Sequence, residues 1–301
     1  MPACLRLLLR AIPVLLVCML LQAIGAGAAG IEVAGPAGLR AKHGSLGPVL
    51  ANNQFNGPLY LESDEAPRTL QGDVYAVVNH PFATVNAALG DARHWCDVLI
   101  LHLNVKYCRR KEADSGTRIE LRIGKKHDQP LASATPVAFA WRVAPATAEY
   151  MQVDLEAPEG PFDTRNYRIL VEAVSIGADR TFLHMGYSFG YGAVSRMAMQ
   201  VYLGTVARDK VGFTATRASQ PGEQPEYIGG MRGLVERNTM RYYLAIDAYL
   251  AGLSAAPAEQ LEKRLQTWFA ATEKYPRQLH EIERDEYLAM KRGEVRRQQT
   301  P

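Results

Sequence analysis

The chain has 301 residues, with 34 lysines and arginines against 31 aspartates and glutamates, and a formal net charge of +3. This near balance lacks the basic stripe that usually marks a nucleic-acid-binding protein, so we expect no nucleic-acid partner. The length suits one domain of ordinary size with additions at its ends.

The first 28 residues are typical of an export signal. Arg6 and Arg10 form a positive start, an apolar run follows over residues 11–21, and Ala26-Gly27-Ala28 is typical of a cleavage site. The run is shorter than the about 20 residues that a membrane span needs. An uncleaved anchor is the alternative, but we expect cleavage and a periplasmic or secreted protein. Loss of the two arginines then lowers the net charge from +3 to +1.

Export leaves two cysteines, Cys96 and Cys108, and an oxidising compartment favours a disulfide between them. Such a bridge requires the chain to fold back within twelve residues, which would span about 40 Å if extended. Two buried thiols are the alternative. His94 and His102 lie close by, but the spacing matches no standard zinc pattern, so we predict no metal site and no cofactor.

Residues 29–69 show little periodicity and predict a loose arm with one short edge strand at 58–61. A regular series follows. The predicted elements are strand 73–79, helix 81–90, strands 101–107, 118–123, 137–143, 150–155, 167–174 and 181–189, and a long helix at 193–213. The breaks between strands are short, which requires antiparallel pairing because a parallel crossover needs a dozen or more residues.

The last part of the chain is predicted to be helical. A linker rich in glycine and proline spans 215–229, and apolar stripes at helical spacing follow over 230–301. Pro257 and Pro276 each stand where one helix must stop and another can start. These stripes must be buried. We expect them to dock on the sheet domain, with a separate protein partner as the alternative.

Two segments resemble a known superfamily. The stretch VYAVVNHPFATVNAAL (Val74 to Leu89) resembles the first strand and helix of the START and polyketide cyclase-like proteins, and Arg180 to Thr214 resembles their last strand and gripping helix. The resemblance covers residues 70–214. It implies an α+β helix-grip fold, in which a strongly curved antiparallel sheet grips a long helix, here 193–213. The helices of 230–301 would form a C-terminal extension.

The resemblance also implies a class of ligand. Members mostly bind lipids, sterols or polyketides, and some catalyse reactions in the same cavity. The superfamily has no common catalytic motif, so we assign no catalytic residue.

The alternation along the strands gives an independent argument. Odd-numbered positions are mainly apolar and are predicted to face inward. The predicted ligand-binding residues are Tyr107, Phe139, Trp141, Tyr167 and Tyr187 of the strands, and Met197 and Val201 of the long helix. His102, Lys106 and His184 have the opposite parity and are expected on a solvated face. An inner face without ionisable groups weighs against acid–base catalysis. A solidly packed core is the alternative to a cavity.

Two basic groups remain. Arg232, Arg237 and Arg241, with Glu236, fall on or near one helix, where they bind an anionic head group or, as we expect, pair along the helix surface. The second group lies at the chain end and complements a helix C-terminus, with peripheral membrane contact as the alternative. It consists of Lys291, Arg292, Arg296 and Arg297.

The sequence therefore predicts an exported protein that binds a hydrophobic, lipid-like small molecule between the sheet and the helix 193–213. One alternative is an enzyme that acts on such a molecule in the same cavity, as a cyclase or a hydrolase. Another is an envelope interaction protein that recruits a partner through its C-terminal helices.

Overall fold

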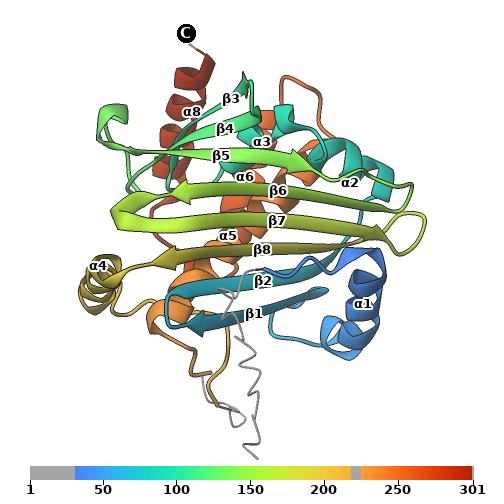
Figure 1. Ribbon diagram of the computed structural model, residues 1–301, viewed down its shortest axis with the longest axis horizontal. Helices are drawn as coiled ribbons and strands as arrows, with labels where there is room; N and C mark the ends of the chain where they lie inside the picture. The colour runs from blue at the N-terminus through green and yellow to red at the C-terminus, as the bar shows by residue number, and fades with distance from the viewer. Residues whose placement is uncertain (1–30, 218–224, 300–301) are drawn as a thin grey trace, which may run out of the picture.

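The computed structural model describes residues 31–217 and 225–299, and the predicted export signal lies outside them. Within these ranges, eight strands form one antiparallel sheet, which Figure 1 presents face-on. The strands are β1 (Leu59–Ala66), β2 (Thr69–Val78), β3 (Val105–Ala113), β4 (Gly116–Ile123), β5 (Thr135–Val143), β6 (Tyr150–Glu159), β7 (Thr164–Ser175) and β8 (Thr181–Tyr191). Their order across the sheet is β1-β2-β8-β7-β6-β5-β4-β3.

The predicted antiparallel pairing is confirmed. The β3–β4 hairpin turns where expected, with Ala113 opposite Gly116. Gly116 has a φ of 104°, which favours a residue without Cβ. The pairing of β2 with β8 brings together the first and last strands of the region that carries the superfamily resemblance.

The predicted inward parity is confirmed for β4 to β8. Residues in register across neighbouring strands share a face of the sheet. Leu121 is opposite Val137, Val153 is opposite Val171, and Val171 is opposite Met185, and all of these are buried in one core. This concave face therefore carries the apolar residues that the alternation predicted.

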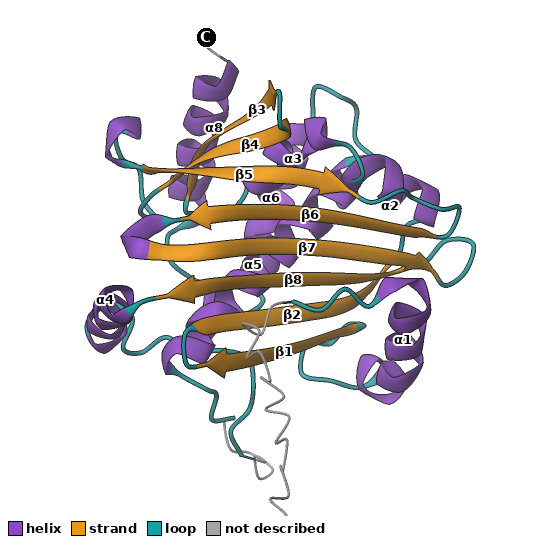
Figure 2. Cartoon of the chain, viewed as in Figure 1, coloured by secondary structure: helices purple, strands orange, loops and turns teal. Residues whose placement is uncertain are grey.

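The helices lie mainly on the concave side of the sheet, behind it in Figure 2. They are α2 (Phe82–Leu89), α3 (Trp95–Leu99), α5 (Gly230–Gly252), α6 (Gln260–Thr272), α7 (Pro276–Leu279) and α8 (Arg284–Gln299). α4 (Ala193–Gly204) lies at one end of the sheet, and α1 (Gly35–Ala51) lies on the outer face. None of the helices in the described ranges is long and apolar enough to cross a membrane.

The gripping helix is α5, and the prediction that residues 193–213 fill this place is wrong. α5 packs against β1, β2 and β8, and it is buried along nearly its whole length. The side chain of Thr239 lies where a Cβ on Gly72 would be, so the missing side chain allows close approach. The helical segment after β8 ends at Gly204 and exposes Val194, Met197 and Val201 instead. The fold is still α+β and of the helix-grip type.

The C-terminal helices dock on the sheet domain of the same chain, as expected. Trp268 of α6 stacks on Tyr287 of α8, with ring centroids 4.9 Å apart, and both side chains are buried. Tyr287 donates a hydrogen bond to the carbonyl of Leu101. The segment after 230 therefore completes the core of the domain.

Residues 35–51 form a helix where we predicted a loose arm. Leu39, Leu46 and Leu50 are buried against Val174 and Phe182 on the outer face of the sheet. Four glycines and Pro48 weaken the intrinsic tendency of α1 to form a helix. Packing of its apolar stripe outweighs this, since most helix stability in proteins comes from tertiary contacts.

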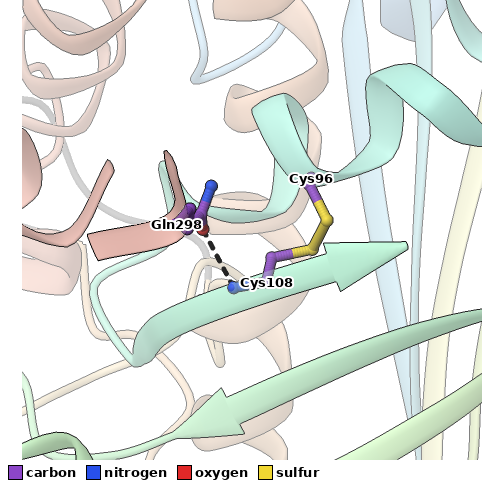
Figure 3. The surroundings of a disulfide bond; sticks show 3 residues. All are labelled: Cys96, Cys108 and Gln298. Carbon is purple, nitrogen blue, oxygen red and sulfur yellow. Dashed lines mark hydrogen bonds between the residues drawn. A yellow bond between two sulfur atoms is a disulfide. The ribbon is translucent and has the colours of Figure 1, made fainter. Parts of the chain in front are cut away.

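The predicted disulfide between Cys96 and Cys108 is present, and Figure 3 shows it joining α3 to β3. The two Cα atoms lie 5.3 Å apart, so the chain does fold back between them. The backbone N–H of Cys108 donates to Oε1 of Gln298 on α8 at 2.9 Å. α8 therefore pairs with the open edge of β3, whose backbone groups have no neighbouring strand.

Candidate functional site

The structure places the predicted ligand-binding residues in three separate regions. Phe139, Trp141, Tyr167 and Tyr187 lie on the concave face. Tyr107 lies on the outer face. Met197 and Val201 lie on α4, each with 61% of its surface exposed. Of the seven predicted residues, therefore, only these four lie where they could line a pocket between the sheet and the gripping helix.

A row of aromatic rings crosses the concave face, and we call it the aromatic row. The centroids of Tyr167 and Phe189 are 5.2 Å apart, and those of Tyr167 and Tyr187 are 6.2 Å apart. Tyr242 of α5 continues the row, 5.2 Å from Tyr187 and 4.5 Å from the imidazole of His102. The row therefore connects the sheet with the gripping helix.

One end of this row is accessible. Tyr167 of the row is only partly buried, as is Trp141 on the same face of β5, whereas Tyr187 is 5% exposed. The hydroxyl of Tyr167 lies 2.8 Å from Oγ1 of Thr164. The indole Nε1 of Trp141 is buried but has no hydrogen-bond partner within the described residues. A buried donor that lacks an acceptor costs about 1–3 kcal/mol, so this position favours an additional acceptor.

A β-bulge places Tyr107 on the other face of the sheet. Val105 is opposite Ile123, but Tyr107 is opposite Arg122, so β3 contains one extra residue at position 106. A bulge reverses the side-chain parity beyond it. Tyr107 consequently lines a cleft of about 570 Å³ beside Arg109, Arg122 and Pro158. This cleft has charged walls and differs from the predicted apolar chamber.

The prediction that His102 lies on a solvated face is wrong, because its side chain is 2% exposed. Nδ1 accepts a hydrogen bond from the backbone N–H of Asn104 at 3.1 Å, which leaves the proton of the neutral ring on Nε2. Nε2 has no partner among the described residues. Burial, and then the charge of Arg241, lower the pKa of His102 well below its ordinary value. The imidazole is therefore neutral near pH 7.

Lys106 and Lys291 are also buried. We predicted Lys106 on a solvated face, and Lys291 at a helix C-terminus or in contact with a membrane. Nζ of Lys291 donates to the carbonyls of His102 and Val105 and to Glu294, at 2.7–2.9 Å. Lys106 pairs with the same carboxylate at 3.1 Å. Burial lowers the pKa of Lys291 to about 7, while Glu294 acts in the opposite direction. The chain-end cation thus holds α8 on β3 and is no membrane-facing group.

A second group of charges surrounds Glu281, and we call it the cation cluster: Lys126, Lys210, Arg237 and Arg241. Oε1 of Glu281 accepts from Lys126 at 2.6 Å and from Arg241 at 2.7 Å. Arg237 donates to the carbonyl of Val211, and Lys210 donates to that of His280. The concave side therefore contains cations that α5 and the loops contribute, whereas the prediction of almost no ionisable side chain concerned the inner face of the strands.

The prediction that Arg232, Arg237 and Arg241 form ion pairs along the surface of α5 is wrong. Arg232 donates to the hydroxyl and the carbonyl of Ser63 on β1. Glu236 is fully buried and accepts bonds from Ser63 and Thr214 and from the backbone of Phe213. The buried carboxylate therefore ties α5 to β1 and to the chain that enters the linker.

His184 is buried on the outer face, where we predicted solvent. Its ring lies between Asp73 and Glu172, at 2.8 and 3.1 Å, and stacks on Tyr75 with centroids 4.4 Å apart. Period-two alternation correctly placed this side chain opposite the core, but it could not reveal that α1 and the residues before it cover this face. The sequence signal that could have found this is the leucine spacing of 39, 46 and 50.

The part of the chain that the structure describes offers no metal centre of the usual composition. A zinc site with His94 and His102 would need the thiolates of Cys96 and Cys108, and both sulfurs are joined in the disulfide. Across residues 31–217 and 225–299, no group of three or more histidines, cysteines, aspartates and glutamates is arranged to hold a metal ion.

Comparison with known proteins gives a fold likeness only. No family model matches the chain, and no curated protein matches it. Among solved structures, the chain is similar to the Zhui aromatase/cyclase of Streptomyces, with 15% identity, a TM-score of 0.31, and coverage of 46% of this chain and 86% of that one. Norcoclaurine synthase of Thalictrum flavum matches with 13% identity, a TM-score of 0.33, and coverage of 48% and 91%.

Human StAR-related lipid transfer protein 5 matches with 10% identity and a TM-score of 0.31, covering 56% of this chain and 88% of that one. The helix-grip description of this chain rests on its own antiparallel sheet and on the packing of α5 against β1, β2 and β8. Likeness at this level carries no information on ligand or reaction, so a function for this chain must be argued from its own residues.

Proposed function

We propose that the protein is an exported binding protein for a small molecule with a large apolar part, held on the aromatic row between the sheet and α5. The disulfide supports export, because such bonds persist in oxidising compartments. Binding sites of this class combine apolar walls with a few hydrogen-bonding groups. Trp141, Tyr167 and Tyr187 supply both.

The buried indole N–H of Trp141 carries the proposal. It belongs to a side chain that is partly exposed on the concave face, and it has no acceptor among the residues that the structure describes. A ligand that stacks on Trp141 and Tyr167 can supply the missing acceptor. The hydroxyl of Tyr167 lies within the same row and offers a second polar contact.

Tryptophan fluorescence tests this proposal directly. Of the three tryptophans, Trp95 and Trp268 are each 1% exposed, so Trp141 is the one placed to report a ligand. We expect delipidated protein to bind dodecanol with a change in fluorescence, and native mass spectrometry to detect the complex. Trp141→Ala should weaken binding about tenfold or more, since burying one aromatic side chain contributes about 1.5–3 kcal/mol.

Phe162→Ala is the matched control, because Phe162 is an aromatic residue with 81% of its surface exposed at the β6–β7 connection. The Phe162→Ala variant should bind dodecanol with the same affinity as the wild type. Failure of the folded wild-type protein to bind dodecanol or any apolar compound from envelope lipid extracts contradicts the proposal.

An enzyme that uses the same row is the second candidate, and His102 favours it. The Nε2–H of this neutral, buried imidazole, which contacts the row through Tyr242, has no partner among the described residues and can donate a hydrogen bond to an oxygen on which charge develops in a bound molecule. Incubation with the lipid that co-purifies with the protein distinguishes the two functions. Recovery of the lipid unchanged supports binding alone, whereas turnover that His102→Asn abolishes, with binding retained, supports the enzyme.

A further inference from the structure

The cation cluster holds more positive charge than its own partners neutralise. Lys126, Lys210, Arg237 and Arg241 surround one carboxylate, that of Glu281, which is 11% exposed at its side chain. Within the described residues, Lys210 and Arg237 are bonded only to backbone carbonyls. Glu236 also lies beside Arg237, but four hydrogen bonds from other donors already occupy it.

The two arginines of the cluster are buried, and Lys126 and Lys210 are partly buried. Arg237 is 3% exposed and Arg241 is 1% exposed. Burial, and then the charge of Arg241, lower the pKa of Lys126 to about 8, although Glu281 acts in the opposite direction. Burial followed by Arg241 likewise lowers the pKa of Arg237 to about 10. Unpaired charge in such a place is costly unless a counter-charge joins it.

Two buried nitrogens beside the cluster have no acceptor. Nε of Arg241 has no hydrogen-bond partner among the described residues, and neither has Nε2 of His102. Arg241 and Lys126 are among the cations whose charge lowers the pKa of His102, which places the imidazole in their neighbourhood. The cluster therefore combines surplus positive charge with unused N–H donors.

We propose that the cation cluster binds an oxyanion, namely the carboxylate or phosphate head group of the ligand held on the aromatic row. Guanidinium groups match carboxylate and phosphate oxygens in geometry, and lysine ammonium groups add compact positive charge. This inference rests on the proposed function and narrows the ligand to an anionic amphiphile.

Two successive residues of α5 connect the head-group site with the apolar site. Tyr242 follows Arg241 directly in α5, and its ring contacts both Tyr187 and His102. Lys126 donates to the hydroxyl of Tyr202 near the end of α4 and has a side chain 24% exposed. The head group therefore lies toward the solvent-accessible side of Lys126, and the rest of the ligand, with the acceptor for Trp141, extends along the row.

Binding of dodecanoate and dodecanol, measured by calorimetry at matched ionic strength, tests the inference. We expect the acid to bind at least tenfold more tightly, and the preference to disappear in Lys126→Gln and in Arg237→Gln. Arg232→Gln is the control, since this arginine lies on the same helix but donates to Ser63. It should retain the preference.

Inorganic phosphate distinguishes a head group from a free anion. Equal affinity of the wild type for acid and alcohol overturns the oxyanion site and leaves the proposed function intact. Binding of phosphate without binding of either twelve-carbon compound overturns the proposed function, and with it the head-group assignment. If neither phosphate nor either twelve-carbon compound binds, both proposals fail. A preference that survives in Lys126→Gln and Arg237→Gln also overturns the site.

Discussion

Nδ1 of His184 lies 3.1 Å from Oε2 of Glu172 beneath α1. The same imidazole reaches Asp73 through Nε2 at 2.8 Å. Glu172 also accepts bonds from Tyr150 and from the backbone N–H groups of Ala34 and Gly35. The pair therefore fastens the start of the described chain to the outer face of the sheet.

This network predicts a defined pH range of maximum stability. Burial disfavours the imidazolium, but the bonds to Asp73 and Glu172 outweigh it and raise the pKa of His184 above its ordinary 6.5. Burial likewise disfavours the carboxylate of Glu172, but His184 and Tyr150 outweigh it and lower the pKa of Glu172 below 4.5. The contribution of His184 is complete below pH 6.5 and is lost as the pH rises through its folded pKa. That of Glu172 is complete above pH 4.5 and is lost as the pH falls.

Urea unfolding between pH 4 and pH 9 measures this contribution as the difference between wild type and His184→Gln. We expect the difference in unfolding free energy to be largest between pH 4.5 and 6.5 and to shrink at higher pH. His127→Gln, at an exposed position, is the control and should follow the wild type. A difference that does not vary with pH contradicts the assigned roles.

Two glutamate variants compare a buried with an exposed ion pair. Glu294→Gln leaves Lys106 and Lys291 in the core without their carboxylate, and we expect a loss of about 3–5 kcal/mol in unfolding free energy. Glu262→Gln breaks the exposed pair with Arg292 and should cost about 0–1 kcal/mol. Chemical denaturation checks both values. Similar losses in the two variants would mean that α8 is not fastened through Glu294.

Removal of the disulfide should destabilise the protein without changing the fold. Its loop joins residues twelve apart, and closing a loop of about that length contributes about 3 kcal/mol in the chain-entropy model. We expect C96S/C108S to unfold at correspondingly lower denaturant concentration and to be indifferent to reductant. Equal stability of the wild type with and without reductant would contradict this expectation, provided mass spectrometry verifies complete reduction.

The outward face of α4 is the place where we expect peripheral membrane contact. Val194, Met197 and Val201 are 61–69% exposed, and Phe162 nearby is 81% exposed with a left-handed φ of 58°. α4 has no acidic side chain, and Arg196 is exposed on it. We therefore expect the protein to co-sediment with phosphatidylglycerol vesicles. Met197→Asp should reduce binding about tenfold, since burying one such side chain contributes about 1.5–3 kcal/mol.

Val49→Asp is the control for this experiment, because Val49 is an exposed apolar residue on α1. This variant should sediment like the wild type. Equal binding by Met197→Asp and wild type would exclude α4 as the contact surface. The basic chain end is a poorer candidate, since Lys291 is buried and Arg292 pairs with Glu262.

Features that depend on near neighbours in the chain could be predicted from the residues alone. Period-two alternation predicted which residues of β4 to β8 face the core, and Ala113 to Gly116 predicted the hairpin. Short breaks required antiparallel pairing, and the two cysteines left after the predicted export step predicted the disulfide. Each of these follows from local geometry or from covalent chemistry.

Which helix or strand face packs against which could be learned only from the folded structure. An apolar stripe on a helix shows that one face prefers burial but does not specify a partner, so α4 and α5 could not be assigned to the sheet from their patterns. The extra residue at position 106 reversed the parity of β3, which moved Tyr107 outward and brought Lys106 into the core. The cation cluster likewise joins α5 to loops that are distant in sequence, so the charge on the concave side depends on packing that alternation along single strands does not encode.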